Sequence, residues 1–199
     1  MPDFRFENAC AGPVCGIDEA GRGPWAGPVV AAAVILDRAK VPQGLDDSKK
    51  LTPARRETLF AAIMTSASVG IGIADVARID RAHILNATLW AMAQAVAALP
   101  VTPAIALVDG NRPPVLACPV QLIIAGDSKS ASIAAASIIA KVTRDRMMVG
   151  LDAAWPGYGF ARHKGYGTRE HAEALARLGP CGGHRVSFAP VRGYRKPLS

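Results

Sequence analysis

Residues 27–36 constrain the fold more than any other part of the chain, because nearly every side chain in this stretch is apolar. A strand with one face in water alternates apolar and polar residues, so an unbroken apolar run predicts a strand that is covered on both faces. Helices must then pack above and below the sheet. The sequence therefore favours an α/β domain with three layers.

The remaining elements can be placed by their apolar patterns and end signals. Further strands are predicted at residues 14–18, 68–74, 104–108 and 120–124. Helices are predicted from Pro53 to about residue 64, over residues 84–99, from Ser130 to about residue 149, and from Thr168 through Leu178. Gly150 is expected to end the third of these helices. Suitable N-caps are Thr52, Asp75, Ser130 and Thr168. With no internal repeat and no long linker, residues 1–199 are expected to form one domain with an N-terminal extension over residues 1–13.

Composition narrows the class of protein. Half of the 199 residues are apolar, which is enough for a substantial core. No apolar run reaches the ~18 residues of a membrane span, and the first residues, which include Asp3 and Glu7, do not resemble a signal peptide. A cytoplasmic protein without a membrane partner is expected. None of the four cysteines lies in a Cys-x-x-Cys pair, so reduced, mostly buried thiols are expected rather than structural zinc or a disulfide framework.

The net charge of +7 is concentrated in the last third of the chain. Residues 141–199 hold 11 of the 23 Lys and Arg residues and 4 of the 16 acidic ones, whereas residues 1–140 hold 12 of each. A localised basic surface is typical of proteins that bind nucleic acids, although charge alone is equally compatible with a basic surface that has no specific partner. The basic part from about residue 150 to residue 199 is the expected substrate-binding region.

Four carboxylates follow apolar segments that are predicted strands. Asp18 and Glu19 follow the first strand, and Asp109 and Asp127 follow two later ones. Carboxylate oxygens are preferred ligands of Mg²⁺, and two such ions ~4 Å apart can hydrolyse a phosphodiester. Neighbours in a regular strand point to opposite faces, so Asp18 and Glu19 can share a site only if the strand ends or bends there. A single Asp after a strand more often starts a turn or caps a helix, but four together favour a metal site.

Gly21, Arg22 and Gly23 form a glycine-flanked turn directly after the first acidic pair. Glycine lets a backbone approach a ligand closely, and the arginine can contact phosphate or cap its own turn. The spacing is not that of a dinucleotide fingerprint, and this segment alone is also compatible with a plain tight turn.

Polar loops supply further candidates for substrate contacts, through ammonium groups and backbone N–H groups that can hold phosphates. The candidates are Ser48, Lys49, Lys129, His163, Lys164, Tyr166 and Arg185. Loops with Asp-Ser-Lys sequences are more often solvated segments or helix caps. His163 could be a general base, a phosphate contact or a surface residue, whereas Tyr166 could stack on a sugar or base.

Taken together, these segments resemble bacterial ribonuclease HII. The matching stretches are residues 16–24, 47–51, 108–111, 126–128, 133–142, 144–145, 163–168, 184–185 and 187–188, in the order of that family. The first is Gly-Ile-Asp-Glu-Ala-Gly-Arg-Gly-Pro, and residues 163–168 are His-Lys-Gly-Tyr-Gly-Thr. The resemblance implies the ribonuclease H-like fold, a mixed central β-sheet flanked by helices, with a small helical and basic C-terminal extension.

The resemblance also implies an activity. The family hydrolyses the RNA strand of RNA–DNA hybrids and incises duplex DNA 5′ to single embedded ribonucleotides, leaving 3′-hydroxyl and 5′-phosphate ends. Its metal-binding acidic quartet maps onto Asp18, Glu19, Asp109 and Asp127, which implies a divalent-metal cofactor, Mg²⁺ or Mn²⁺.

Substrate recognition can be carried over in the same way. The family segment that reads the 2′-hydroxyl at the RNA–DNA junction maps onto Gly21, Arg22 and Gly23, and its junction-sensing tyrosine maps onto Tyr166. About 13 residues precede the first strand, which favours type HII over type HIII with its extra N-terminal domain. The basic tail over residues 192–199 has no obvious sliding-clamp motif, so no obligate protein partner is expected, and a monomer is favoured.

Two other functions stay open from the sequence. One is a catalytically silent nucleic-acid-binding module of the same fold, which would need a broken acidic site. The other is a nuclease of this fold that cuts DNA junctions. Strict dependence on a 2′-hydroxyl in the substrate separates a type 2 ribonuclease H from that second alternative.

Overall fold

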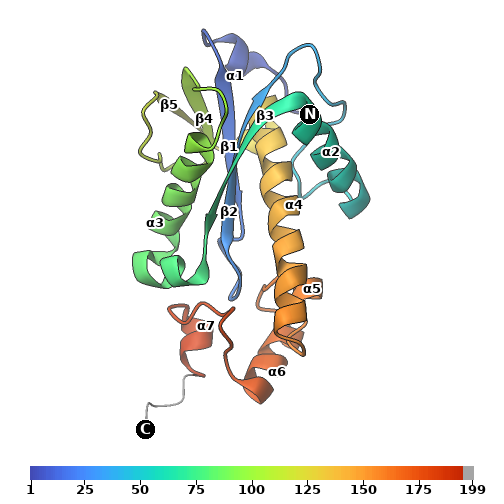
Figure 1. The fold of residues 1–199 in the computed structure, drawn as a ribbon, viewed down its shortest axis with the longest axis vertical. Helices are drawn as coiled ribbons and strands as arrows, with labels where there is room; N and C mark the ends of the chain where they lie inside the picture. Colours follow the sequence, from blue (N-terminus) through green and yellow to red (C-terminus); the bar gives the residue numbers. More distant parts are fainter. Residues whose placement is uncertain (195–199) are drawn as a thin grey trace.

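Residues 1–194 are described by a computed structural model, and they contain a mixed sheet of five strands in the order β3-β2-β1-β4-β5 (Figure 1). The strands are β1 (Val14–Ala20), β2 (Val29–Leu36), β3 (Ala67–Ala74), β4 (Ile105–Asp109) and β5 (Val120–Ile123). β2 pairs antiparallel with β1 and β3, whereas β4 runs parallel to β1 and β5. Residues 195–199, the end of the basic tail for which no clamp motif is expected, lie outside the described residues.

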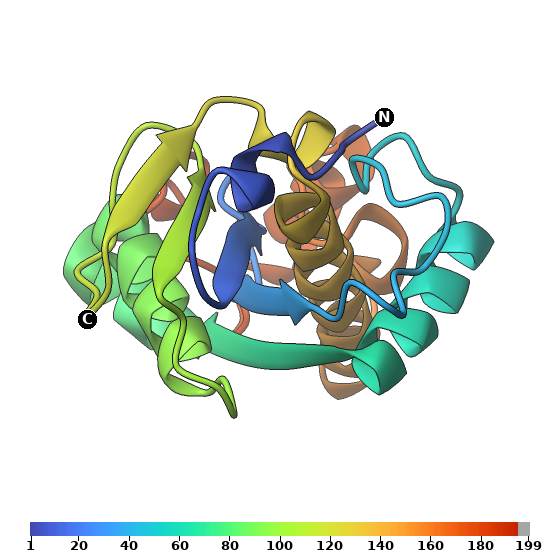
Figure 2. The same cartoon turned by 90° about the horizontal axis from the view of Figure 1, so that it is seen from above.

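Helices cover both faces of this sheet. On one face lie α4 (Ala131–Ala154) and α2 (Pro53–Ser66), and on the other lies α3 (Val76–Ala97) (Figure 2). The shorter helices are α1 (Arg5–Asn8), η1 (Gly126–Ser128), α5 (Phe160–His163), α6 (Arg169–Leu178) and α7 (Ala189–Arg192). In Figure 1, α6 and α7 form a C-terminal extension beyond the lower end of the sheet. The predicted mixed sheet flanked by helices is confirmed.

β2 is covered on both faces, as its apolar sequence predicted. Ala32 and Val34 pack in the core beneath α4 and α2, while Ala31 and Ala33 pack in the core beneath α3. Successive side chains of a strand point to opposite faces, so one apolar strand contributes to both cores.

Glycines in the sheet let both long helices approach closely. A Cβ on Gly16 of β1 would lie 2.1 Å from the backbone carbon of Ser132 in α4, and a Cβ on Gly72 of β3 would lie 2.0 Å from a carbonyl oxygen of α3. Real Cβ atoms do not come this near to backbone atoms, so larger residues would push the layers apart. The contact at Gly16 fixes the start of α4, and η1 just before it, against β1.

Two helix boundaries differ from the predicted ones. α3 begins well before residue 84, because Asp75 caps it by accepting a hydrogen bond from Arg78 N at 2.7 Å. His83, with φ 63° and ψ 156°, interrupts α3 and separates its first turns from the Ala-rich part that the sequence marks. α4 continues through Gly150, since a glycine costs only about 1 kcal/mol inside a helix and tertiary packing outweighs that cost. The caps predicted at the other three helices are confirmed.

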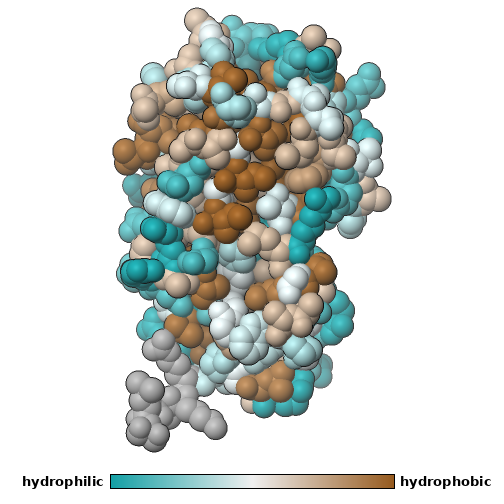
Figure 3. Space-filling view, in the orientation of Figure 1, coloured by the Kyte–Doolittle hydropathy of each residue, from teal (hydrophilic) through white to brown (hydrophobic). Residues whose placement is uncertain are grey.

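One face of the molecule carries exposed apolar side chains. Apolar side chains gather over the middle of the face shown in Figure 3, around the edge strand β3, whose Ile73 is 41% exposed. None of the described helices is long and apolar enough to cross a membrane. All four cysteines are free thiols, but only Cys15 is fully buried, while the other three are half-buried.

Candidate active site

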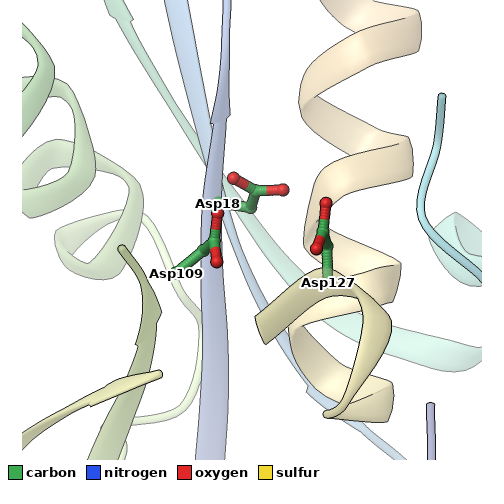
Figure 4. A group of neighbouring side chains, drawn as sticks. All are labelled: Asp18, Asp109 and Asp127. Carbon is green, nitrogen blue, oxygen red and sulfur yellow. The ribbon is translucent and has the colours of Figure 1, made fainter. Parts of the chain in front are cut away.

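Three aspartates from separate elements meet where β4 ends beside β1. Asp18 lies in β1, Asp109 ends β4, and Asp127 lies in η1, between β5 and α4. β1 and β4 are parallel neighbours with Ile17 opposite Val108, so the next residue of each strand presents its carboxylate at the same level. One oxygen from each of the three aspartates lies within 4.8 Å of the other two, and the side chains point toward one another (Figure 4).

Glu19 borders this group without joining it. β1 continues as a regular strand to Ala20, so Glu19 points away from the face that carries Asp18. Its Oε1 lies 3.4 Å from Arg22 Nη1, and the residue lines both the pocket beside Asp18 and a smaller depression beside Asp109. The bend that would bring both acidic neighbours into one cluster is therefore absent from this part of β1.

Burial and mutual repulsion dominate the electrostatics of the cluster. Burial raises the pKa of Asp18 well above its ordinary value, and the charges of Glu19, Asp109 and Asp127 raise it further. The pKa of Asp127 is raised first by burial and then by neighbouring acidic groups, while Lys49, whose Nζ lies 3.6 Å from Asp127 Oδ2, partly offsets the effect. Burial also raises the pKa of Glu19 despite the nearby guanidinium. Anionic oxygens held this closely are stabilised by a cation.

The donor set fits a hard divalent cation. Asp18 Oδ1 accepts a hydrogen bond from Glu19 N and Asp109 Oδ1 accepts one from Gly126 N, both at 2.7 Å. These bonds orient each carboxylate and occupy one of its oxygens, so Oδ2 of each stays available as a ligand. Carboxylate oxygens are the ligands that Mg²⁺ and Mn²⁺ prefer.

A cavity of about 280 Å³ opens beside the cluster. It is lined by Asp18, Glu19, Ala20, Gly21, Arg22, Gly23, Ser48, Lys49, Lys141, Arg144 and Tyr166. Tyr166 is 47% exposed at its edge. Sequence reasoning missed Lys141 and Arg144; the available signal was two cations three residues apart, and hence on one face of the predicted helix.

Four of the predicted substrate contacts do not line this cavity: Lys129, His163, Lys164 and Arg185. Lys129 lines a separate depression with Arg5, and its Nζ donates to Ile124 O at 2.7 Å. Lys164 lines a neighbouring groove of about 580 Å³, which also includes Lys141 and Arg146. Because Lys141 borders both the cavity and the groove, the two are adjacent.

His163 and Arg185, two of the predicted substrate contacts, are hydrogen-bonded inside the protein and do not line the cavity. His163 Nε2 bonds Tyr158 O at 2.8 Å, and its Nδ1 accepts from Gly165 N at 3.2 Å, so both ring nitrogens are occupied. Arg185 is 0% exposed, and its guanidinium donates to four backbone carbonyl oxygens. The sequence alone cannot show that the fold buries the guanidinium of Arg185.

Nearly the whole chain is similar to known proteins. The family model described as Ribonuclease HII matches residues 15–191. The chain belongs to the ribonuclease HII family. Ribonuclease HII of Azorhizobium caulinodans is 65% identical over 186 residues, which cover 94% of this chain and 72% of that protein. Ribonuclease HII of Rhizorhabdus wittichii is 59% identical over 97% of this chain and 96% of its own length.

Solved structures of ribonucleases H2 and HIII share the fold. Ribonuclease H2 from Pyrococcus horikoshii OT3 has a TM-score of 0.78 at 27% identity, covering 92% of this chain and 97% of that one. Ribonuclease HII from Archaeoglobus fulgidus, solved as a complex with PCNA, has a TM-score of 0.76 at 28% identity, with 88% and 95% covered. Bst-RNase HIII, solved with Mn²⁺, matches at 24% identity and a TM-score of 0.69, covering 90% of this chain and 68% of its own.

Membership of the ribonuclease HII family makes this protein a nuclease. The family supports endoribonuclease activity on RNA–DNA hybrids and a dependence on divalent metal, with which the acidic cluster agrees. The predicted family and enzyme class are confirmed.

A histidine cluster behind Tyr166 is a feature of this protein that sequence reasoning did not find. His171 Nε2 and His184 Nε2 lie 3.0 Å apart, and His171 Nδ1 lies 2.9 Å from Tyr166 O. His184 Nδ1 lies 3.0 Å from Cys181 N. Burial lowers the pKa of both histidines, that of His184 to about 4. The cluster therefore holds neutral imidazoles near pH 7 and fixes the backbone that carries the exposed tyrosine.

Proposed function

We propose that this protein cleaves the RNA strand of RNA–DNA hybrids and also incises duplex DNA 5′ to a single embedded ribonucleotide, leaving 3′-hydroxyl and 5′-phosphate ends. The observation that carries the proposal is the meeting of Asp18, Asp109 and Asp127 beside a cavity whose lining includes residues 21–23. The first feature suits phosphodiester hydrolysis, and the second suits recognition of a sugar at close range.

The proposed cofactor is Mg²⁺ or Mn²⁺. Asp18, Asp109 and Asp127 would hold it, and Glu19, at the edge of the cavity, would complete the site and orient water. Two such ions, when bound, supply the activation of water and the charge stabilisation at the departing oxygen. A protein of the same fold, Bst-RNase HIII, has been solved with Mn²⁺, which supports this choice of ion.

Different residues of the cavity would contact different parts of the substrate. Backbone N–H groups of Arg22 and Gly23 would meet the ribose, whose 2′-hydroxyl is the group that separates RNA from DNA. Tyr166, exposed at the edge, would stack on the sugar or base at the junction. Lys49 and Lys141 would contact phosphates and give a salt-sensitive share of the affinity.

The basic groove next to the cavity extends this binding surface. It contains Arg146, Arg162 and Lys164, and Lys141 borders both the groove and the cavity. We propose that it follows the backbone of the duplex, so that the part of the chain from about residue 150 acts with the catalytic centre as one domain.

A duplex DNA that contains one ribonucleotide tests the proposal. Cleavage would be measured with Mg²⁺ or Mn²⁺, with chelator, and on an all-DNA duplex of the same sequence. We expect one metal-dependent nick 5′ to the ribonucleotide, no cut in the all-DNA duplex, and loss of cleavage in Asp109→Asn with unchanged folding.

Two outcomes would overturn the proposal in different ways. Binding without cleavage with either metal would favour the silent binding module. Equal cutting of the all-DNA duplex would favour a general nuclease of this fold.

A further inference from the structure

Two buried arginines lie beneath residues 21–23. Arg144 of α4 is 1% exposed and Arg185 is 0% exposed. Every hydrogen bond that either guanidinium makes within residues 1–194 goes to a backbone carbonyl oxygen. Burial, followed by the nearby charge of Arg144, lowers the pKa of Arg185 to about 9. Burying two cations without a hydrogen-bonded carboxylate costs free energy. The carbonyl groups that surround these guanidinium groups therefore need a structural explanation.

Arg185 holds two successive carbonyl groups of the glycine-flanked turn. Its Nη2 donates to Gly21 O at 2.6 Å, and its Nη1 donates to Arg22 O at 3.0 Å. The same guanidinium donates to Gly27 O at 2.9 Å and to Pro28 O at 3.2 Å, which close the loop from its other side. The planar fork of a guanidinium can satisfy several acceptors at once, whereas an ammonium group cannot reproduce this geometry.

These bonds fix the direction of two backbone N–H groups. In a trans peptide the C=O of one residue and the N–H of the next point in opposite directions, and none of the described peptide bonds is cis. Because Gly21 O and Arg22 O point down to the buried guanidinium, the N–H groups of Arg22 and Gly23 point away from it. Both residues are exposed and line the cavity beside the aspartates.

The two N–H groups have no partner within the described part of the chain. Neither Arg22 N nor Gly23 N donates a hydrogen bond to any of residues 1–194. Successive N–H groups that point the same way form a concave site for an oxygen acceptor. The turn is thus prepared to receive an oxygen atom from the cavity side.

Arg144 supports the same turn from α4. A Cβ on Gly21, whose φ is 98°, would lie 2.0 Å from Arg144 Nε, so the guanidinium packs directly under this glycine. Arg144 Nε donates to Pro28 O at 2.9 Å, and its Nη2 donates to Lys164 O at 3.0 Å. Arg144 therefore joins the turn to the loop that carries Tyr166.

The segment that carries Arg185 is itself held in place, by the loop after the turn and by α3. Its backbone N donates to Trp25 O at 2.8 Å. The two residues that follow are held by Asp80 of α3, whose carboxylate accepts from Val186 N at 3.1 Å and from Ser187 N at 2.9 Å. The chain next to Arg185 is thus anchored to α3 as well as to the loop that the guanidinium holds.

We propose that Arg185, with Arg144 beside it, is a positioning residue for ribose recognition: it turns the N–H groups of Arg22 and Gly23 toward the cavity and thereby sets the preference for a ribonucleotide over a deoxyribonucleotide. The inference rests on the proposed function, because it assigns to these N–H groups the sugar of the scissile nucleotide. The 2′-hydroxyl oxygen is the acceptor that they would meet.

Arg185→Lys tests the proposal, with Arg55→Lys as the matched control. Arg55 is an exposed residue of α2 that also donates to a backbone carbonyl, that of Gln43, but lies outside the cavity. Both substitutions would be made in an Asp109→Asn background with Mg²⁺, so that the duplex stays intact. Affinity for a duplex with one ribonucleotide and for the all-DNA duplex would be measured by fluorescence anisotropy.

Arg185→Lys is expected to reduce the preference for the ribonucleotide duplex about tenfold, the equivalent of about one or two hydrogen bonds, with affinity for the all-DNA duplex within about twofold. Arg55→Lys should keep the full preference. An unchanged preference in Arg185→Lys, or an equal loss of affinity for both duplexes together with a lower melting temperature, would overturn the proposal. If the protein with native Arg185 cleaves the ribonucleotide duplex selectively, such a result leaves the proposed function standing.

A second measurement tests the two N–H groups on which the proposal depends, even if Arg185→Lys fails to fold. Hydrogen exchange of the Arg22 and Gly23 amides would be followed in the Asp109→Asn protein with native Arg185. Exchange should be fast in the free protein and should slow on addition of the ribonucleotide duplex but not of the all-DNA duplex. Equal protection by both duplexes, or by neither, would overturn the proposal.

Discussion

The histidine pair His171 and His184 should make the protein lose stability in mild acid. Cys181 N donates to His184 Nδ1, so the His184 proton sits on Nε2 and points at His171 Nε2, 3.0 Å away. His171 must then carry its own proton on Nδ1, where it donates to Tyr166 O. A further proton on either ring would set one N–H against another, in a site where His184 is only 1% exposed.

The magnitude follows from the pKa of His184, which burial and then the neighbouring His171 lower from 6.5 to about 4. The folded state binds fewer protons than the unfolded state between these values, so stability is full above pH 6.5 and falls as the pH falls toward 4. At 1.36 kcal/mol per pH unit the loss is about 3 kcal/mol. It should level off below pH 4, where both states carry the proton.

The comparison of native protein with His184→Gln isolates this contribution. Urea unfolding would be followed by tryptophan fluorescence in chelator from pH 7 to pH 4. Carboxylates that titrate in this range affect both proteins, so the difference between their free energies of unfolding reports the imidazole. His184→Gln should be less stable at pH 7, because it leaves Cys181 N without an acceptor, and that deficit should shrink by about 3 kcal/mol at pH 4.

His83→Asn serves as the control, because His83 is an exposed histidine outside this pair. This variant should follow the pH dependence of the native protein. A constant difference between native protein and His184→Gln from pH 7 to pH 4 would refute the reasoning about the neutral pair.

Three further substitutions test other parts of the structure. Asp18→Asn should raise the free energy of unfolding in chelator by about 1 kcal/mol, because it removes a buried charge that its neighbours repel. The same variant should lose stabilisation by Mg²⁺. A lower stability in urea denaturation would contradict this expectation. Gly16→Ala should cost about 3 kcal/mol in the same assay, because its Cβ would lie 2.1 Å from the Ser132 backbone, and a neutral result would show that β1 and α4 are not packed this closely. Glu7→Gln should lower the free energy of unfolding by about 1 kcal/mol, because the Glu7 carboxylate lies at the start of α4 and its Oε1 accepts a hydrogen bond from Ser130 Oγ at 2.6 Å. Unchanged stability would show that Glu7 does not stabilise the start of α4.

The sequence predicted the elements whose signals are local. The apolar run of β2 indicated a strand covered on both faces, and Thr52, Ser130 and Thr168 cap the helices that their positions predicted. Helix ends without a strong local signal were less predictable: Gly150 does not end α4, because burial of the helix outweighs the cost of one glycine.

Some features of the candidate site could likewise be predicted from the sequence, and others could not. The aspartates could be found because each follows an apolar strand, and motif order pointed to the family. The separation of Glu19 from the three aspartates could not be found, because it depends on β1 remaining regular through Ala20. The burial of Arg185 was equally hidden, since a charged residue in a basic, glycine-rich segment has the sequence of an exposed one.

The sequence by itself thus determined the fold class, the family and the set of carboxylates, because apolar periodicity, caps and motif spacing act within a few residues along the chain. Tertiary structure alone decided which side chains meet. The pairing of β1 with β4 brings two aspartates together from distant positions, and the packing of the C-terminal segment under residues 21–23 turns Arg185 from a surface charge into a support for the cavity wall. Both outcomes depend on strand register and desolvation, which no local stretch of sequence specifies.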